Sequence, residues 1–259
     1  PNLFKENSDA FRRALEYAKL FEEYHIVSMS ETGFKEVSHG SLRIYPTNSK
    51  LVFFRSVDTI RLGAKIIKEH HIDMIDAQDP GEAGFATYIL ARISGKPWRL
   101  QIHTDVFSPW YRKSGWKEMT RFILACFLVT RASVIRVVSQ RIKESLVSKF
   151  KLSPSKITVL PIFTEVDKFF NRAPDQTDPE GFRRYDFKMI AVGRFVDKEK
   201  NFSMLIRMMR EFIKICPKSL LVIVGEGPDK VSYQLLVTSY QLERNVIIEE
   251  WREDLPSFY

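Results

Sequence analysis

Apolar and polar residues follow two different periodicities along the 259-residue chain. Short apolar runs have the length of buried strands, and longer segments repeat apolar side chains every three or four residues, as on one face of a helix. The two kinds of segment alternate with short connections, which predicts parallel sheets wrapped by helices and therefore an α/β fold. Strands are predicted at residues 25–29, 72–75, 98–103, 133–138, 157–160, 187–192, 220–224 and 246–248, helices at 9–23, 57–70, 81–93, 116–130, 140–150, 202–215 and 229–241, and two further short apolar stretches lie at 42–45 and 51–54.

One segment interrupts this alternation. Residues 163–185 contain two prolines and five acidic residues, with little apolar periodicity. Such a composition is typical of a connection between domains. We therefore expect a first domain at residues 1–165, an interdomain connection at 166–185 and a second domain at 186–259.

The stretch at residues 187–202 (FKMIAVGRFVDKEKNF) carries the most informative chemistry. A strand-length apolar run ends at Gly193, Arg194 and Lys200 follow, and Asn201 is placed to cap the next helix. A strand, a glycine turn and a helix N-terminus in this order favour anion binding, because glycine allows close approach and the first helical N–H groups are unpaired. An ordinary turn with a solvated Arg and Lys is an equally good interpretation of the local pattern.

A second glycine turn follows the next predicted strand, at residues 220–228 (LLVIVGEGP). Together with 187–202, this segment resembles the donor-nucleotide domain of retaining glycosyltransferases of the GT-B fold, the family-four group also called glycosyl transferases group 1. The resemblance extends over most of the chain, through residues 77–84 (AQDPGEAG), 101–105 (QIHTD), 136–146 (RVVSQRIKESL) and 157–169 (ITVLPIFTEVDKF).

The resemblance implies two Rossmann-like domains and a transferase reaction. The family moves a sugar from a nucleotide-diphosphate sugar to an acceptor with retention, and its Arg and Lys bind the donor diphosphate. No metal and no cofactor are implied, because the two cations neutralise the leaving diphosphate and the nucleotide sugar is itself a substrate. The donor-binding residues implied in this chain are Gly193, Arg194, Lys200, Gly225, Gly227 and Pro228.

The same resemblance predicts a chain truncated at both ends. The family has a strand and a Gly-rich loop just before the helix at 9–23, and its later Glu-x7-Glu motif is not in this sequence. We therefore expect the first strand to be missing, the second domain to be incomplete and these residues to be inactive alone. Departures at 249–251 (EEW) and 162–167 (IFTEVD) leave the sugar and base of the donor open.

Three polar residues of the first domain are candidate site residues because each follows a predicted strand, and ligands of α/β sheets bind beyond the carboxyl ends of strands. His103 is the candidate catalytic residue, in contact with donor or acceptor, as the resemblance also implies. Asp79 and Asp105 are candidates for the acceptor side. A structural histidine and two turn-capping aspartates are the open alternatives. The remaining histidines show no ligand spacing and are interpreted as structural: His25, His39, His70 and His71.

Positive charge is concentrated in one segment. Residues 112–156 contain eleven Lys or Arg and two Glu, a net charge of +9, whereas the whole chain carries +8. We expect residues 110–156 to contact an anionic membrane surface, with Trp110, Tyr111 and Trp116 at the level of the headgroups. The acceptor is expected to be a sugar, lipid-linked or phosphorylated. A solvated basic face is the open alternative.

Composition narrows the class of protein further. The longest apolar run, 122–129, is too short to span a bilayer, and Cys126 and Cys216 lack disulfide or metal spacing. We expect a cytoplasmic glycosyltransferase of cell-envelope or exopolysaccharide biosynthesis, able to lie peripherally at the inner face of the membrane. The competing interpretations are a non-catalytic protein that binds nucleic acid or anionic lipid, and a nucleotide-sugar epimerase of GT-B architecture; nucleic acid is not the expected partner.

Overall fold

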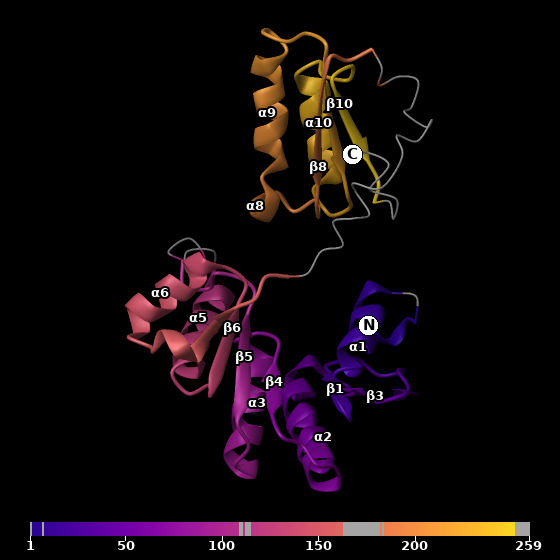
Figure 1. Ribbon diagram of the computed structural model, residues 1–259. Helices are drawn as coiled ribbons and strands as arrows, with labels where there is room; N and C mark the ends of the chain where they lie inside the picture. Colours follow the sequence, from indigo (N-terminus) through magenta and orange to yellow (C-terminus); the bar gives the residue numbers. More distant parts are fainter. Residues whose placement is uncertain are drawn as a thin grey trace. The chain divides into compact units, whose positions relative to one another are not determined.

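Two compact α/β units make up the protein. The computed structural model (Figure 1) describes residues 2–6, 8–108, 111, 115–162, 182 and 184–251. The units are Pro1–Ile162 and Phe163–Tyr259. Both contain parallel strands flanked by helices, so the predicted α/β fold class is confirmed. Most of the predicted connection at 166–185 lies outside the described residues, so that connection stays a prediction.

A four-stranded parallel sheet is the larger sheet of the first unit. Its order is β4 (Ile75–Ala77), β5 (Trp98–Ile102), β6 (Val134–Val137) and β7 (Ile157–Val159). One face packs against α3 (Glu82–Ser94), α5 (Trp116–Val129) and α6 (Gln140–Phe150), with Leu100, Leu128 and Leu146 fully buried between them. The strand predicted at 72–75 begins only at Ile75, because Ile75 pairs with Trp98, the first residue of β5.

A three-stranded sheet completes the first unit, in the order β1 (Tyr24–Ser28), β3 (Leu42–Pro46) and β2 (Val37–His39). β1 and β3 are parallel, and β2, which the apolar pattern did not predict, adds an antiparallel edge. α1 (Asp9–Ala18) packs Phe11 and Ala14 against Leu42 and Ile44 of β3. α2 (Arg55–Glu69) packs against β1 and α3.

Short 3-10 helices join these elements. They are η1 (Asn2–Phe4), η2 (Val52–Phe54) and η3 (Pro154–Lys156). The apolar stretch at 51–54 forms η2 and runs directly into α2, so Phe53 is 92% exposed instead of entering a core. Apolar composition alone therefore did not indicate burial at this position.

The second unit contains a three-stranded parallel sheet in the order β10 (Val246–Glu249), β9 (Ser219–Val224) and β8 (Phe187–Val192). All six residues of the central strand β9 are buried. α9 (Phe202–Phe212) and α10 (Lys230–Ser239) cover one face, where Ile206 and Tyr233 pack with Leu221 and Ile223. A one-turn helix, α8 (Asp197–Lys200), precedes α9 and was not predicted.

Candidate functional site

The carboxyl ends of β8, β9 and β10 meet at one edge of the second unit's sheet. Val192 pairs with Val224, and Val224 pairs with Glu249, so the segments that follow the three strands leave the sheet side by side. Ligands of open parallel sheets bind at this edge. Lys200 is the last residue of α8, and the other predicted donor-binding residues lie in the turns that follow β8 and β9.

Two glycines hold these turns against each other. A Cβ atom on Gly225 would lie 1.9 Å from the carbonyl oxygen of Gly193, and one on Gly227 would lie 2.5 Å from that of Phe195. Both glycines also have positive φ angles, 156° and 153°. Phe195 N donates to the carbonyl oxygen of Glu226 at 2.7 Å and closes the contact. Backbone packing therefore requires glycine at both positions.

Phe195 anchors the turn after β8 in the core of the unit. Its side chain is fully buried, and it meets Phe202 and Tyr233 edge-on at ring-centroid distances of 6.0 and 5.6 Å. Such aromatic pairs contribute about 0.5–1.5 kcal/mol beyond their burial. Phe195 takes the inward position, and the neighbouring Arg194 side chain is 73% exposed.

The amino end of α9 is capped by Asp197. Its Oδ1 accepts from Ser203 N at 2.9 Å, and its Oδ2 accepts from Ser203 Oγ at 2.7 Å. Burial acts to raise the pKa of Asp197, but these hydrogen bonds outweigh it and the pKa is lowered. Asn201 occupies the N-cap position with a left-handed backbone (φ 54°) and no side-chain capping bond, so the predicted cap from Asn201 is wrong.

Arg194 and Lys200 both lie next to Gly193. The Lys200 side chain folds back over this glycine, since a Cβ atom there would lie 3.4 Å from Lys200 Cε. Arg194 Nη2 donates to Glu199 Oε2 at 2.7 Å. Both groups of this ion pair are exposed, so it stabilises the fold by about 0–1 kcal/mol and can yield to a phosphate, which accepts a stronger bidentate bond.

The end of β10 adds carboxylates to the same edge. Glu250 accepts from Lys230 Nζ at 2.7 Å, and this hydrogen bond lowers the pKa of Glu250. The carbonyl oxygen of Glu249 accepts from Gly225 N at 3.1 Å. The departure from the family pattern at 249–251 thus places acidic residues next to the glycine turn.

In the first unit, His103 follows the carboxyl end of β5 and is half-buried. Loss of solvent lowers the pKa of His103, Arg136 lowers it further, and Asp76 and Asp79 oppose the shift. The imidazole is therefore neutral near pH 7. A neutral imidazole has one donor and one acceptor nitrogen, so it can either donate a hydrogen bond to a sugar hydroxyl or accept one from it.

Asp79 and Asp105 have structural partners. Asp79 Oδ1 accepts from Gly81 N at 2.6 Å and closes the turn into α3. Asp105 Oδ2 lies 3.0 Å from Arg141 Nη1 of α6. The contact of Asp79 accounts for it as a loop-forming residue, whereas Asp105 Oδ1 is buried without a hydrogen-bond partner among the described residues. The acceptor-side roles of both stay predictions.

Sequence reasoning missed a polar row across this sheet. Asp76 on β4 accepts from Gln101 Nε2 and from Arg99 Nε, each at 2.5 Å, and Gln101 Oε1 accepts from Arg136 Nη1 on β6. Two residues of this row, Arg136 and Asp76, are among the charges that shift the pKa of His103. The residues are far apart in sequence, and strand alternation was the one signal that could have placed them on a common face.

Some predicted site residues cannot be placed. Trp110, Arg112 and Lys113 lie outside the described residues. Within the described part of the chain, the group of three side chains close enough to share a metal ion is Glu23, His25 and His70, and it contains none of the predicted site residues.

The folds of the two units are of the GT-B class, and solved glycosyltransferase structures share this architecture. Residues 13–168 match the family described as Glycosyltransferase Family 4, and residues 174–259 match Glycosyl transferases group 1. The first match alone covers more than half of the chain. The chain therefore belongs to glycosyltransferase family 4, and the resemblance seen in the sequence is confirmed.

Curated relatives are similar over most of this chain. The UDP-Gal:alpha-D-GlcNAc-diphosphoundecaprenol alpha-1,3-galactosyltransferase of Escherichia coli is 26% identical over 208 residues, which cover 74% of this chain and 51% of that protein. The N-acetylgalactosamine-N,N'-diacetylbacillosaminyl-diphospho-undecaprenol 4-alpha-N-acetylgalactosaminyltransferase of Campylobacter jejuni is 29% identical, with 62% and 42% covered. The chain thus spans about half the length of these relatives.

Solved structures agree on the fold. Sucrose-phosphate synthase from Thermosynechococcus elongatus superposes with a TM-score of 0.69 at 15% identity, covering 91% of this chain and 62% of that one. Anabaena Alr3699/HepE, solved in complex with UDP-glucose, gives a TM-score of 0.59 at 16% identity, with 85% and 58% covered. At these identities the likeness shows the fold alone.

Proposed function

We propose that the protein transfers a sugar from a nucleotide-diphosphate sugar to an acceptor, with retention at the anomeric carbon. The observation that carries the proposal is the pair of interlocked glycine turns that presents Arg194 and Lys200 beside Gly193. A forked donor and a point charge next to an exposed turn suit the two phosphates of the donor. Membership of the family and the names of the relatives support the same class of reaction.

The transfer exchanges one bond for another. The bond between the anomeric carbon and a diphosphate oxygen breaks, and the acceptor oxygen forms the new bond on the same face of the sugar. The acceptor proton passes to an oxygen of the departing diphosphate. Negative charge grows on the diphosphate as its bond breaks, and Arg194 and Lys200 stabilise that charge. Neutral His103 is proposed to bond a hydroxyl of the donor or the acceptor.

We further propose a lipid-linked acceptor and a membrane contact through α5. Large apolar side chains recur at helical spacing along the exposed side of this helix, where Trp116 is 74% and Ile123 60% exposed. Lys117 and Arg121 are exposed on the same helix. Apolar residues flanked by cations suit the boundary between acyl chains and anionic headgroups. Both relatives described above carry diphosphoundecaprenol in the names of their substrates.

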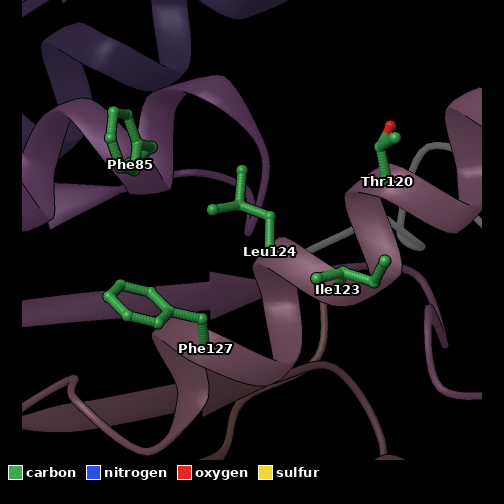
Figure 2. A pocket seen from close by; sticks show the side chains of 5 residues that line it. All are labelled: Phe85, Thr120, Ile123, Leu124 and Phe127. Carbon is green, nitrogen blue, oxygen red and sulfur yellow. The ribbon is translucent and has the colours of Figure 1, made fainter.

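An apolar pocket lies on this exposed side of α5. The pocket is open and has a volume of about 350 Å³. Figure 2 shows Phe85 of α3 facing side chains of α5 across it. Four of its five lining side chains are apolar, which suits the hydrocarbon part of a lipid. No helix within the described residues is long and apolar enough to cross a bilayer. The lining residues are Phe85, Thr120, Ile123, Leu124 and Phe127.

A thermal-shift screen tests the donor proposal. The protein is heated with uridine, guanosine and adenosine diphosphates, with their sugars, and with the matching nucleosides. A ligand that binds the folded state raises the melting temperature by mass action, so one diphosphate series should do so and its nucleoside should not. Equal shifts from nucleoside and diphosphate, or no shift from any of them, would contradict a diphosphate site.

Vesicle sedimentation tests the membrane proposal. The wild type should bind anionic vesicles at low salt, and Lys117→Ser with Arg121→Ser should weaken binding by about 1 kcal/mol per lost charge. Lys65→Ser with Lys68→Ser on α2 removes the same charge from another exposed helix and is the matched control. Sedimentation that is equal for both double variants would show that α5 is not the contact.

A further inference from the structure

Two side chains from the start of β1 and one from the end of α2 converge outside the candidate site. Glu23 precedes β1, His25 lies on β1, and His70 ends α2. Glu23 Oε2 lies 3.3 Å from His25 Nε2 and 3.0 Å from His70 Nδ1. The three donor atoms all lie within 4.8 Å of one another.

Two of these separations match the edges of a zinc tetrahedron. Zinc bonds to imidazole nitrogen and carboxylate oxygen are about 2.0–2.1 Å long, which places neighbouring tetrahedral ligands about 3.3 Å apart. The two Glu23 distances already have this length. The two imidazole rings are 4.4 Å apart between centroids and their donor nitrogens lie within 4.8 Å of each other, so these nitrogens move closer together when one ion binds both.

The hydroxyl of Tyr45 favours the tautomer of His25 that can bind a metal ion through Nε2. His25 Nδ1 lies 3.2 Å from Tyr45 Oη, a partner that can hold the proton on Nδ1 and leave the Nε2 lone pair facing Glu23. Metal-bound histidines usually donate their other N–H to such a partner. The His25 side chain is 6% exposed, whereas His70 at 31% and Glu23 at 46% leave solvent and an ion a way in.

We propose that Glu23, His25 and His70 bind a Zn²⁺ ion, with water as the fourth ligand. Two imidazoles and one carboxylate are a donor set that zinc accepts. The site joins the amino end of β1 to the carboxyl end of α2, whereas the candidate site residues follow the carboxyl ends of strands. The ion therefore links β1 to α2 within the first unit, and its fourth position stays open to water. His25 and His70 are 45 residues apart, so the fold, and not sequence spacing, brings them together.

Isothermal titration of the whole chain with Zn²⁺ tests the proposal. The wild type should bind one ion, and Mg²⁺ should not compete, because Mg²⁺ prefers all-oxygen octahedral sites. Glu23→Gln and His70→Ala should each lower the affinity by more than about 100-fold, and Tyr45→Phe, which removes only the supporting hydroxyl, by about tenfold. Glu23 and His70 are partly exposed, so both variants should still fold.

The neighbouring histidine provides the matched control. His71 is exposed and lies 3.6 Å from Asp73, outside the cluster, so His71→Ala should bind Zn²⁺ like the wild type. Co²⁺ in the same site should give the intense visible absorption of four-coordinate cobalt, lost in His70→Ala. Wild-type affinity in Glu23→Gln and His70→Ala, a weak octahedral cobalt spectrum, or no stoichiometric Zn²⁺ binding would each overturn the proposal.

Discussion

The two carboxyl edges of this protein are built in opposite ways. In the second unit, contacts between backbones hold the turns, and the cations Arg194 and Lys200 lie beside turns that they do not hold together. In the first unit, the aspartates themselves build the loops, because Asp79 bonds Gly81 and Asp105 pairs with Arg141. A side chain that the fold does not need for its stability can bind a ligand instead. The carboxyl edge of the second unit's sheet is therefore the better-defined site.

Replacing Gly225 tests the backbone frame and should have the largest effect. In Gly225→Ala the new Cβ atom would meet the Gly193 carbonyl oxygen at 1.9 Å, and backbone cannot give way as a flexible side chain can. We expect a loss of about 3 kcal/mol or more in the free energy of unfolding of the second unit, the upper range for overpacking. Hydrogen exchange of the β9 amides measures this loss without interference from the first unit.

The variant Gly40→Ala separates the cost of a steric clash from the cost of a positive φ angle. Gly40 also has a positive φ angle, 58°, but a Cβ atom there would meet nothing within 4 Å. The expected cost is about 1 kcal/mol, that of a left-handed backbone alone. If the two variants lose equal stability, the interlocking of the turns is not what requires glycine.

The helix cap offers the next largest effect. Asp197→Ala removes both bonds to Ser203 and should lower the free energy of unfolding by about 0.5–2 kcal/mol. Because the folded-state pKa of Asp197 is lowered, its contribution is present above its ordinary pKa and is lost as the pH falls through the folded value. Urea titration measures this loss, and Asn201→Gly should be nearly neutral in it. A larger loss in Asn201→Gly than in Asp197→Ala would show that Asn201 caps the helix.

The protonation of His103 should have a smaller effect on the free energy of unfolding, and this effect should depend on pH. Its pKa is lowered in the folded state, so below the ordinary value of about 6.5 the unfolded chain takes up the proton first. Its contribution to stability is therefore complete above that pH and declines as the pH falls through the folded pKa. The NMR titration of the imidazole should have a midpoint below 6.5, and Arg136→Gln should raise the midpoint. A midpoint above 6.5 would contradict the neutral histidine.

Much of the fold could be predicted from apolar periodicity. The helix at 140–150 has the predicted bounds, because Ser139 caps it and its apolar face packs on β6 and β7. The three strands of the second unit were predicted to within one residue, since each is a short and mostly apolar run. The stretch at 51–54 and the strand β2 were not, because the first is apolar without being buried and the second has one half-buried apolar residue.

The candidate site was predictable where backbone geometry demands a residue type. Gly225 and Gly227 pack against backbone too closely for any other residue, so their spacing carries information. A Cβ atom on Gly193 would meet only side-chain atoms, the nearest at 3.2 Å. The partners of the charged side chains were not predictable. Nothing in the local pattern shows that Glu199 pairs with Arg194 or that Gln101 links Asp76 to Arg136, because those contacts depend on register and on side-chain direction.

The central claim is that Arg194 and Lys200 bind the two phosphates of a nucleotide-sugar donor. Isothermal titration with the nucleoside diphosphate selected by the thermal screen tests it most directly. Arg194→Ala and Lys200→Ala should each lose about 1.5–3 kcal/mol of binding free energy, the value of a hydrogen bond to a charged group. Lys214→Ala removes an exposed lysine that follows α9 and pairs with Glu211, and it should bind like the wild type. Equal affinity in all three variants and the wild type would contradict the claim.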